Sequence, residues 1–175
     1  WRDSSSDVSL YLTRVEDPRA YGLVPTDADG RVTQFLEKPS TPEEIVTDQI
    51  NAGCYVFRRS VIDSIPTGRP VSVERETFPG LLARGAVVTG FVDDGYWLDL
   101  GTPLAFVQGS CDLVLGRAPS PALPGRTGQF LVRPGAEVEP DAILSNGTFV
   151  GAGATVGSGA VVDGSSLFDN AMVAA

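Results

Sequence analysis

Histidine is absent from this 175-residue chain, and basic residues and long apolar runs are scarce. The chain therefore lacks the side chain that most often serves as a general base near neutral pH. Its 13 basic residues are outnumbered by 22 acidic ones, giving a net charge of −9, which argues against nucleic-acid binding because that requires a basic face. No run approaches the roughly 20 apolar residues of a membrane span, and no signal peptide is recognisable. The composition thus predicts neither a nucleic-acid partner nor a membrane partner.

Cysteine and methionine are also rare. Cys54 and Cys111 lie in apolar contexts with no spacing typical of metal ligands, which favours a reduced, cytoplasmic protein. The sequence opens at Trp1, has Met172 as its single methionine and stops within a repeat. We therefore expect it to be part of a longer polypeptide. The 20 glycines and 13 prolines favour a loop-rich or repeat architecture over a helical bundle.

Patterning in the first part of the chain predicts a mixed α/β domain. The segment 27–30 (DADG) has turn chemistry and predicts a hairpin between residues 23–26 and 31–37. The mostly apolar run 50–57 predicts a buried strand. Further strands are expected at 8–15 and 87–92.

Two helices carry clear start and stop signals. Ser72 is a predicted N-cap, with Glu74 and Glu76 in the first turn and Gly85 as the stop. Thr102 and Pro103 begin a second helix that Gly116 ends. The expected buried face of this second helix contains Phe106, Val107, Cys111 and Val114.

The composition changes after this second helix. Residues 117–128 (RAPSPALPGRTG) have linker composition. We therefore expect a first domain at 1–116, a linker at 117–133 and a second domain at 134–175.

The second domain has a six-residue period. The third position of successive units is Val138, Leu144, Val150, Val156, Val162, Phe168 and Ala174. The first position is mostly small: Ala136, Ala142, Thr148, Ala154, Ala160, Ser166 and then Met172. Such a period fits neither a helix nor simple strand alternation, and it predicts the start of a left-handed parallel β-helix with a triangular cross-section. A hexapeptide-repeat acyltransferase is a less favoured alternative because that chemistry usually uses histidine.

Four short motifs in the first domain follow one another in a fixed order: YGLV at 21–24, FLEKP at 35–39, NAGCY at 51–55 and WLDLGTP at 97–103. Together with the repeats behind them, these motifs resemble the sugar-1-phosphate nucleotidyltransferases. The stretches 48–53 and 73–79 favour the mannose and guanine branch of that family. The resemblance implies the C-terminal part of a Rossmann-like nucleotidyltransferase domain, followed by the β-helix.

Each motif offers a side chain suited to this chemistry. Glu37 can accept hydrogen bonds from sugar hydroxyls, and Lys38 can bind an anomeric phosphate if a bend at Pro39 brings the two together. Gly22, next to Tyr21, would let a sugar lie close to the backbone. Asn51 can bind vicinal hydroxyls, although a structural network is a serious rival because a buried Asn needs partners anyway. The resemblance implies that Tyr21, Gly22, Glu37, Lys38 and Asn51 bind the substrate.

Asp99 is the candidate metal ligand. An unpaired carboxylate between two leucines is costly, and Mg²⁺ would compensate it with the oxygen ligand it prefers; hydrogen bonds to the following loop are the alternative. The resemblance implies that Asp99 shares this ion with a second Asp outside this sequence, and that Lys38 and Asp99 are the catalytic residues.

The implied reaction joins a sugar 1-phosphate and a nucleoside triphosphate, with mannose 1-phosphate and GTP as the expected pair. The glycine-rich phosphate loop of the family is not found in these 175 residues, so we expect them to be inactive alone. Two alternatives remain: a glucose-1-phosphate uridylyl-, thymidylyl- or adenylyltransferase, and a catalytically silent regulatory subunit. The repeat domain favours a homo-oligomer.

Overall fold

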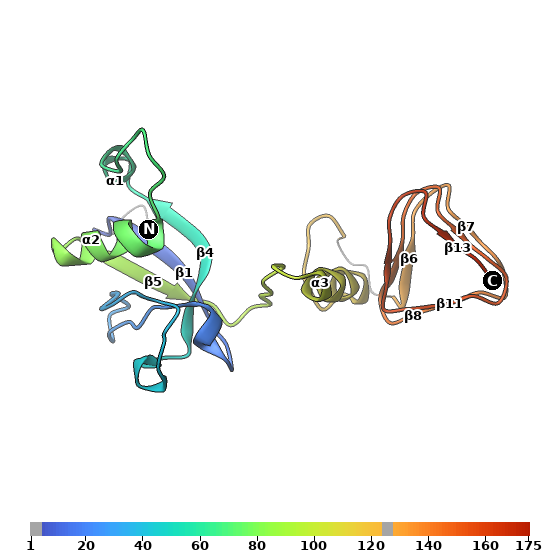
Figure 1. Ribbon diagram of the computed structural model, residues 1–175, viewed down its shortest axis with the longest axis horizontal. Helices are drawn as coiled ribbons and strands as arrows, with labels where there is room; N and C mark the ends of the chain where they lie inside the picture. The colour runs from blue at the N-terminus through green and yellow to red at the C-terminus, as the bar shows by residue number, and fades with distance from the viewer. Residues whose placement is uncertain (1–4, 124–127) are drawn as a thin grey trace. The chain divides into compact units, whose positions relative to one another are not determined.

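The computed structural model describes residues 5–123 and 128–175 (Figure 1). The chain forms two compact units that meet in sequence between Gly95 and Tyr96, and each is described by itself.

The first unit is built on a mixed five-stranded sheet with the order β3-β2-β4-β1-β5. Its strands are β1 (Val8–Arg14), β2 (Gly22–Leu23), β3 (Leu36–Glu37), β4 (Gln49–Phe57) and β5 (Val88–Val92). The central strand β1 pairs antiparallel with β4 and parallel with β5. The strands predicted around residues 8–15, 50–57 and 87–92 are therefore confirmed.

Short helical segments accompany the sheet. They are the 3-10 turns η1 (Pro18–Ala20) and η2 (Pro42–Glu44), α1 (Arg59–Asp63), the single π-turn η3 (Val73–Thr77) and α2 (Phe78–Ala83). The Arg75 amide donates to Ser72 Oγ at 3.1 Å, so the predicted cap is confirmed. Gly85 follows α2 with a φ of +74°, a left-handed conformation that suits glycine. Helix α1 was not among the elements predicted from the sequence.

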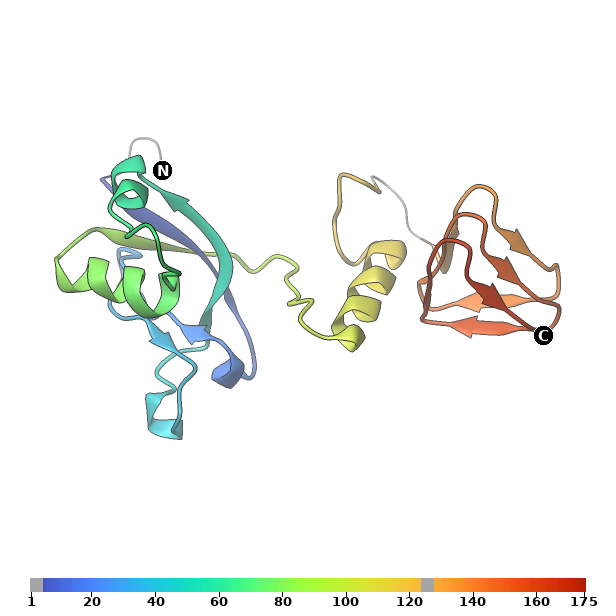
Figure 2. The same cartoon turned by 45° about the horizontal axis from the view of Figure 1, so that its top comes forward.

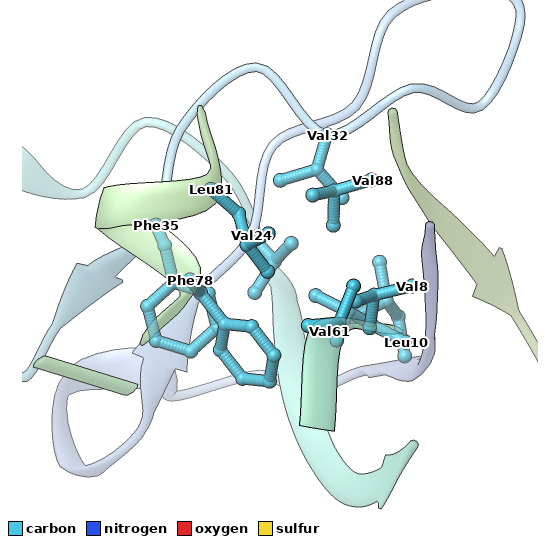
Figure 3. Close-up of a cluster of buried hydrophobic side chains, with 10 residues drawn as sticks. Val8, Leu10, Val24, Val32, Phe35, Val61, Phe78, Leu81 and Val88 are labelled. Atoms are coloured by element: carbon cyan, nitrogen blue, oxygen red, sulfur yellow. The ribbon is translucent and has the colours of Figure 1, made fainter. Parts of the chain in front are cut away.

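The core of the first unit lies between the sheet and the helices (Figure 3). Alternate β1 residues Val8, Leu10 and Leu12 are at most 1% exposed, as a strand with one covered face requires. Phe78 and Leu81 of α2 pack on them, and burying a side chain of this size contributes about 1.5–3 kcal/mol. This core holds in place the strands that carry the candidate site.

The predicted hairpin is confirmed between β2 and β3. The Asp27 amide donates to the Arg31 carbonyl at 2.9 Å and the Gly30 amide donates to the Asp27 carbonyl at 3.1 Å. Gly30 has a φ of +76°, so the turn needs glycine there. The hairpin brings the YGLV and FLEKP segments side by side.

Strand β4 is less buried than its apolar sequence predicts. Ile50 and Asn51 are buried, but Gly53 and Cys54 are exposed. The pairing of β1 with β4 shifts register between Leu10 and Leu12, and Gly53 has a φ of +79°. The bulge at this point changes which residues of β4 face the core.

The second unit contains α3 (Pro103–Leu115) and the repeat strands. Thr102 Oγ accepts from the Ala105 amide at 3.1 Å, and Gly116 ends the helix with a φ of +75°, as predicted. Helix α3 packs on β6, β9 and β12 of the repeats.

The division at Gly95 thus differs from the predicted domain boundary in the 117–133 linker, because the helix buries Cys111 and Val114 within the second unit. Residues 124–127 of that linker lie outside the described residues.

The repeat strands form a coil of three parallel sheets (Figures 1 and 2). They are β6 (Phe130–Val132), β7 (Glu137–Val138), β8 (Ile143–Ser145), β9 (Thr148–Val150), β10 (Thr155–Val156), β11 (Val161–Asp163), β12 (Ser166–Leu167) and β13 (Met172–Val173). Glu137 pairs with Thr155 and Ile143 with Val161, an offset of 18 residues. Three six-residue faces per turn require that offset. Val150, Ala154, Val156, Ala160 and Val162 form the buried centre.

The six-residue register does not extend to the last repeats, which corrects the prediction for Phe168, Ala174, Ser166 and Met172. Phe149 pairs with Ser166 and Thr155 with Met172, an offset of 17 residues. As a result Leu167 and Val173 pack on the inner cluster, while Phe168 is 65% and Met172 85% exposed. The repeat that begins at Ala160 is one residue short.

Candidate functional site

The β2–β3 pairing places the first two motifs against each other. Gly22 lies opposite Glu37 in the antiparallel register, and the Lys38 amide donates to the carbonyl of half-buried Tyr21 at 3.2 Å. A Cβ on Gly22 would lie 2.8 Å from Glu37 Oε2 and 3.1 Å from the Phe35 ring. The space freed by the missing side chain is therefore occupied by the Glu37 carboxylate and by Phe35, which packs on Phe78 at 5.2 Å between ring centroids (Figure 3).

The chain bends directly after Glu37. Strand β3 ends there, and exposed Lys38 has a φ of +52°, which is uncommon for a residue with a side chain. A continued strand would send these neighbouring side chains to opposite faces. The left-handed conformation before Pro39 removes that restriction, and the predicted bend is present.

Asn51 is buried on β4 and lies at the centre of a hydrogen-bond network. Its Nδ2 donates to the Tyr55 hydroxyl at 2.7 Å and to Glu74 Oε1 at 2.9 Å, while the Gly53 amide donates to Asn51 Oδ1 at 3.0 Å. Both N–H groups are thus used within the protein, and a further partner can only donate to Oδ1. The structural network that the sequence left open is present, and Asn51 also fixes the carboxylate of Glu74.

Glu74 is the residue that sequence reasoning missed. Glu74 lies in the first turn after Ser72, as predicted, but its carboxylate also contacts Asn51, which lies 23 residues earlier. Glu74 belongs to the stretch 73–79 that supports the family resemblance, and this was the only available signal. Local patterning cannot show a contact between a strand and a distant turn.

Glu37 interacts electrostatically with Glu74 and is thereby linked to the hydrogen-bond network of Asn51. Burial raises the pKa of Glu37, and the charge of Glu74 raises it further, whereas Lys38 and Arg75 lower it. Burial also raises the pKa of the Tyr55 hydroxyl, which the hydrogen bond from Asn51 opposes. The first unit therefore gathers two carboxylates that can accept hydrogen bonds from hydroxyl groups and two cations that can attract a phosphate.

Asp99 belongs to the second unit and lies in an irregular segment between β5 and α3. Its side chain is exposed, so the cost of burial that motivated a metal ligand does not arise. Nowhere in residues 5–123 and 128–175 do three or more His, Cys, Asp or Glu side chains cluster as a metal site would require. The donor chemistry fits Mg²⁺, but Asp99 can supply only one of its ligands.

Two further observations concern the cysteines and the helices. Both Cys54 and Cys111 are free thiols, the first exposed and the second buried. Within the described residues, no helix has the length and apolar character needed to cross a bilayer.

The sequence is similar to known proteins along nearly its whole length. The family model described as nucleotidyl transferase matches residues 2–114, so the chain belongs to that family. The mixed sheet of the first unit is that of an α/β nucleotidyltransferase fold.

Individual relatives narrow the comparison. The chain is 58% identical over 175 residues to the mannose-1-phosphate guanylyltransferase of Mycobacterium tuberculosis, which covers 99% of this chain and 48% of the relative. It is 36% identical over 142 residues to the catalytic subunit beta of mannose-1-phosphate guanylyltransferase from Drosophila pseudoobscura pseudoobscura, covering 78% of this chain and 37% of that protein. The chain thus spans about half or less of the length of these curated relatives.

Among solved structures, HddC from Yersinia pseudotuberculosis matches 61% of this chain and 44% of its own. The sequence identity is 26% and the TM-score is 0.49, too low to support an argument about the fold.

Proposed function

We propose that this chain is the sugar-phosphate-binding part of an enzyme that forms GDP-mannose and pyrophosphate from GTP and mannose 1-phosphate. The observation that supports it is the cluster in the first unit, where Glu37 lies against Gly22 and is near enough to Glu74, the partner of Asn51, for the two charges to interact, with Lys38 next in sequence. The identity of 58% to the Mycobacterium tuberculosis protein supports the choice of mannose and guanine.

In this proposal, different residues of the cluster bind different parts of mannose 1-phosphate. The carboxylates of Glu37 and Glu74 accept hydrogen bonds from sugar hydroxyls, and Asn51 holds Glu74 in place. Tyr21 and Gly22 form the backbone wall beside the sugar, and Gly22 leaves room for the Glu37 carboxylate. The Lys38 ammonium binds the anomeric phosphate as a compact cation.

The reaction itself needs no nucleophile from the protein. A phosphate oxygen of mannose 1-phosphate attacks the α-phosphorus of GTP, a P–O bond forms, the bond from that phosphorus to the α–β bridging oxygen breaks, and pyrophosphate leaves with the electron pair. Positioning and charge neutralisation provide the catalysis in such transfers. Asp99 would supply one oxygen ligand to a bound Mg²⁺, whose charge would offset the negative charge of the phosphate oxygens.

The second unit is proposed to have a structural role. Its three parallel sheets and offset of 18 residues support a left-handed β-helix of hexapeptide repeats, whose function is assembly into a homo-oligomer. The free thiols support a reducing, cytoplasmic location.

The test begins with binding to this chain. Calorimetric titration with mannose 1-phosphate should show binding that is lost in Lys38→Ala and strongly weakened in Glu37→Gln, with glucose 1-phosphate as the comparator. Gly22→Ala should also weaken binding, because its Cβ would lie 2.8 Å from Glu37 Oε2. Gly80→Ala is its matched control, because a Cβ there meets only the tip of Arg84 at 3.8 Å. Tighter binding of glucose 1-phosphate than of mannose 1-phosphate would leave the family unchanged but would make glucose 1-phosphate the substrate.

The second step is an assay of the full-length polypeptide that carries these residues. Incubation with mannose 1-phosphate and each of four nucleoside triphosphates should give a sugar nucleotide from GTP. These 175 residues alone should give none. Sugar binding with no product from any nucleotide would instead favour a silent regulatory subunit.

A further inference from the structure

The segment that carries Asp99 is fixed at both ends by helix α3, although it has no regular secondary structure of its own. At its start, the Tyr96 hydroxyl donates to Asp112 Oδ2 at 2.9 Å. At its end, Thr102 caps the helix through the Ala105 amide. All of these residues belong to the second unit.

Asp112 is the buried acceptor of a hydrogen-bond network. The residue is 6% exposed, and its Oδ1 accepts from Gln108 Nε2 at 3.0 Å and from Arg117 Nη1 at 3.3 Å. Burial alone would raise the pKa of this carboxyl group, but the hydrogen bonds from Gln108, Tyr96 and Arg117 lower it below its ordinary value. The Asp112 side chain is therefore well satisfied by donors.

The network joins a buried carboxylate to donors that are themselves partly exposed, since the Arg117 side chain is 64% exposed and Tyr96 is 43% exposed. A carboxylate whose two oxygens are both satisfied provides a fixed geometry for the groups that it joins. Here those groups are helix α3, Arg117 after the helix and Tyr96 before it.

Gly109 provides the second attachment. A Cβ on this buried glycine would lie 2.9 Å from Leu100 Cδ2 and 3.4 Å from Leu98 Cδ2, so the helix surface is open where the two leucines rest. Successive side chains of an extended chain alternate in direction. Leu98 and Leu100 both reach the helix at Gly109, so Asp99 between them lies on the opposite side of the segment; Asp99 is exposed, and Leu100 itself is 56% exposed.

We propose that Asp112, acting through Tyr96 and supported by Gly109, is a positioning residue that holds the Asp99 carboxylate in its metal-binding orientation. The inference rests on the proposed function, since it takes Asp99 as a metal ligand. Groups that orient a metal ligand from behind change metal affinity by about 10–100-fold when they are removed.

The experiment compares Tyr96→Phe, Asp112→Asn and Gly109→Ala in the full-length polypeptide. Mn²⁺ affinity in the presence of GTP is measured from the electron paramagnetic resonance signal of the free ion, and hydrogen exchange is followed at the backbone amides of residues 97–101. We expect Mn²⁺ affinity to fall by about 10-fold in Tyr96→Phe, which removes one hydroxyl and keeps the ring. Exchange at 97–101 should become faster.

Asp141→Asn is the matched control. Its carboxylate accepts from Ser158 Oγ at 2.8 Å on the coil, so the substitution makes the same chemical change within the same unit. Mn²⁺ affinity and exchange at 97–101 should stay at the original values. Gly109→Ala keeps Tyr96 and Asp112 and improves the intrinsic helix propensity of α3, so a fall in Mn²⁺ affinity there cannot come from a weaker helix.

Asp99→Asn separates the inference from the proposed function. If Asp99→Asn lowers Mn²⁺ affinity but Tyr96→Phe and Gly109→Ala do not, the positioning role is refuted and the metal role of Asp99 stands. If Asp99→Asn leaves Mn²⁺ affinity unchanged, the metal role fails and the positioning role fails with it. Faster exchange without a change in affinity also refutes the proposal.

Discussion

Glu37 is held in the folded protein at an energetic cost. Its pKa is raised by burial and by Glu74, and the neighbouring cations Lys38 and Arg75 only partly compensate. A carboxylate kept in such surroundings is typical of a functional site, where strain is tolerated for binding. The same carboxylate should therefore lower stability and favour sugar binding.

Glu37→Gln should stabilise the first unit at neutral pH while weakening mannose 1-phosphate binding. Because the folded-state pKa lies above the unfolded value, the charged carboxylate destabilises the fold only at pH values above that unfolded pKa. The gain in the melting temperature Tm, no more than about 5 °C, should be present at pH 7 and disappear as the pH falls below 4 or so. Thermal melts between pH 3 and 8 measure it.

Glu16→Gln is the control, since this exposed residue of the same unit removes one negative charge without disturbing the cluster. A gain in Tm of equal size in Glu16→Gln would attribute the effect to the net charge of the chain. A gain in Glu37→Gln that persisted at pH 3 would contradict the electrostatic cause.

Single residues were predictable from the sequence where their partners lie within a few positions. The caps Ser72 and Thr102 and the terminating Gly116 follow from local hydrogen bonds and backbone conformation, and the structure confirms them. The contact of Asn51 with Glu74 did not follow, because it depends on how the sheet brings a turn against a strand. The predicted site was therefore missing one of its two carboxylates.

At the scale of elements, Gly147 shows how closely α3 approaches the coil. A Cβ at this buried position would lie 2.6 Å from the Cys111 carbonyl oxygen and 2.7 Å from its Cα. Both of these Cys111 atoms belong to the backbone, which cannot move aside without shifting the helix. Gly147 also has a φ of +83°.

Gly147→Ala should destabilise the second unit more than Gly159→Ala. Gly159 has a similar φ of +70° in the same coil, but a Cβ there meets nothing within 4 Å. The left-handed backbone should cost about 1–2 kcal/mol in both variants. The clash with Cys111 should add about 1–3 kcal/mol in Gly147→Ala alone. Equal free energies of unfolding for Gly147→Ala and Gly159→Ala, measured by urea titration, would show that α3 does not rest on the coil at Gly147.

The short repeat gives a second prediction at this scale. Because the register shifts after Val162, Leu167 faces the inner cluster and Phe168 is 65% exposed. Leu167→Ala should therefore cost about 1–3 kcal/mol of unfolding free energy, and Phe168→Ala less than about 1 kcal/mol. An uninterrupted six-residue period would give the reverse order.

The coil was predictable and the shift was not, for a physical reason. A strict period identifies the inward positions from Val138 to Val162, but both registers offer a small residue two places before an apolar one at the end of the chain. Ser165 with Leu167 fits the pattern as well as Ser166 with Phe168 does. Only the pairing of Thr155 with Met172 decides between them.

At the scale of the whole molecule, the composition of the sequence and the packing of α3 place the boundary between the two units at different positions. Residues 117–128 have the prolines and glycines of a linker, and the sequence therefore predicts a domain boundary there. Whether a helix before a linker belongs to the preceding or the following unit depends on where its apolar face is buried. In α3, Cys111 and Val114 are buried within the unit that contains the coil.

The polypeptide 96–175 should consequently fold more stably than the polypeptide 117–175. Loss of α3 would expose the side of β6, β9 and β12 that the helix covers, and some 25 cal/mol of stability is lost for each Å² of apolar surface returned to water. Circular dichroism and urea titration of both polypeptides measure the difference in the free energy of unfolding. Asp141→Asn in 96–175 is the control variant, and it should leave that difference unchanged. The shorter polypeptide should also bind a hydrophobic dye that the longer one does not. Equal stability would place α3 with the first unit, as the linker composition suggested.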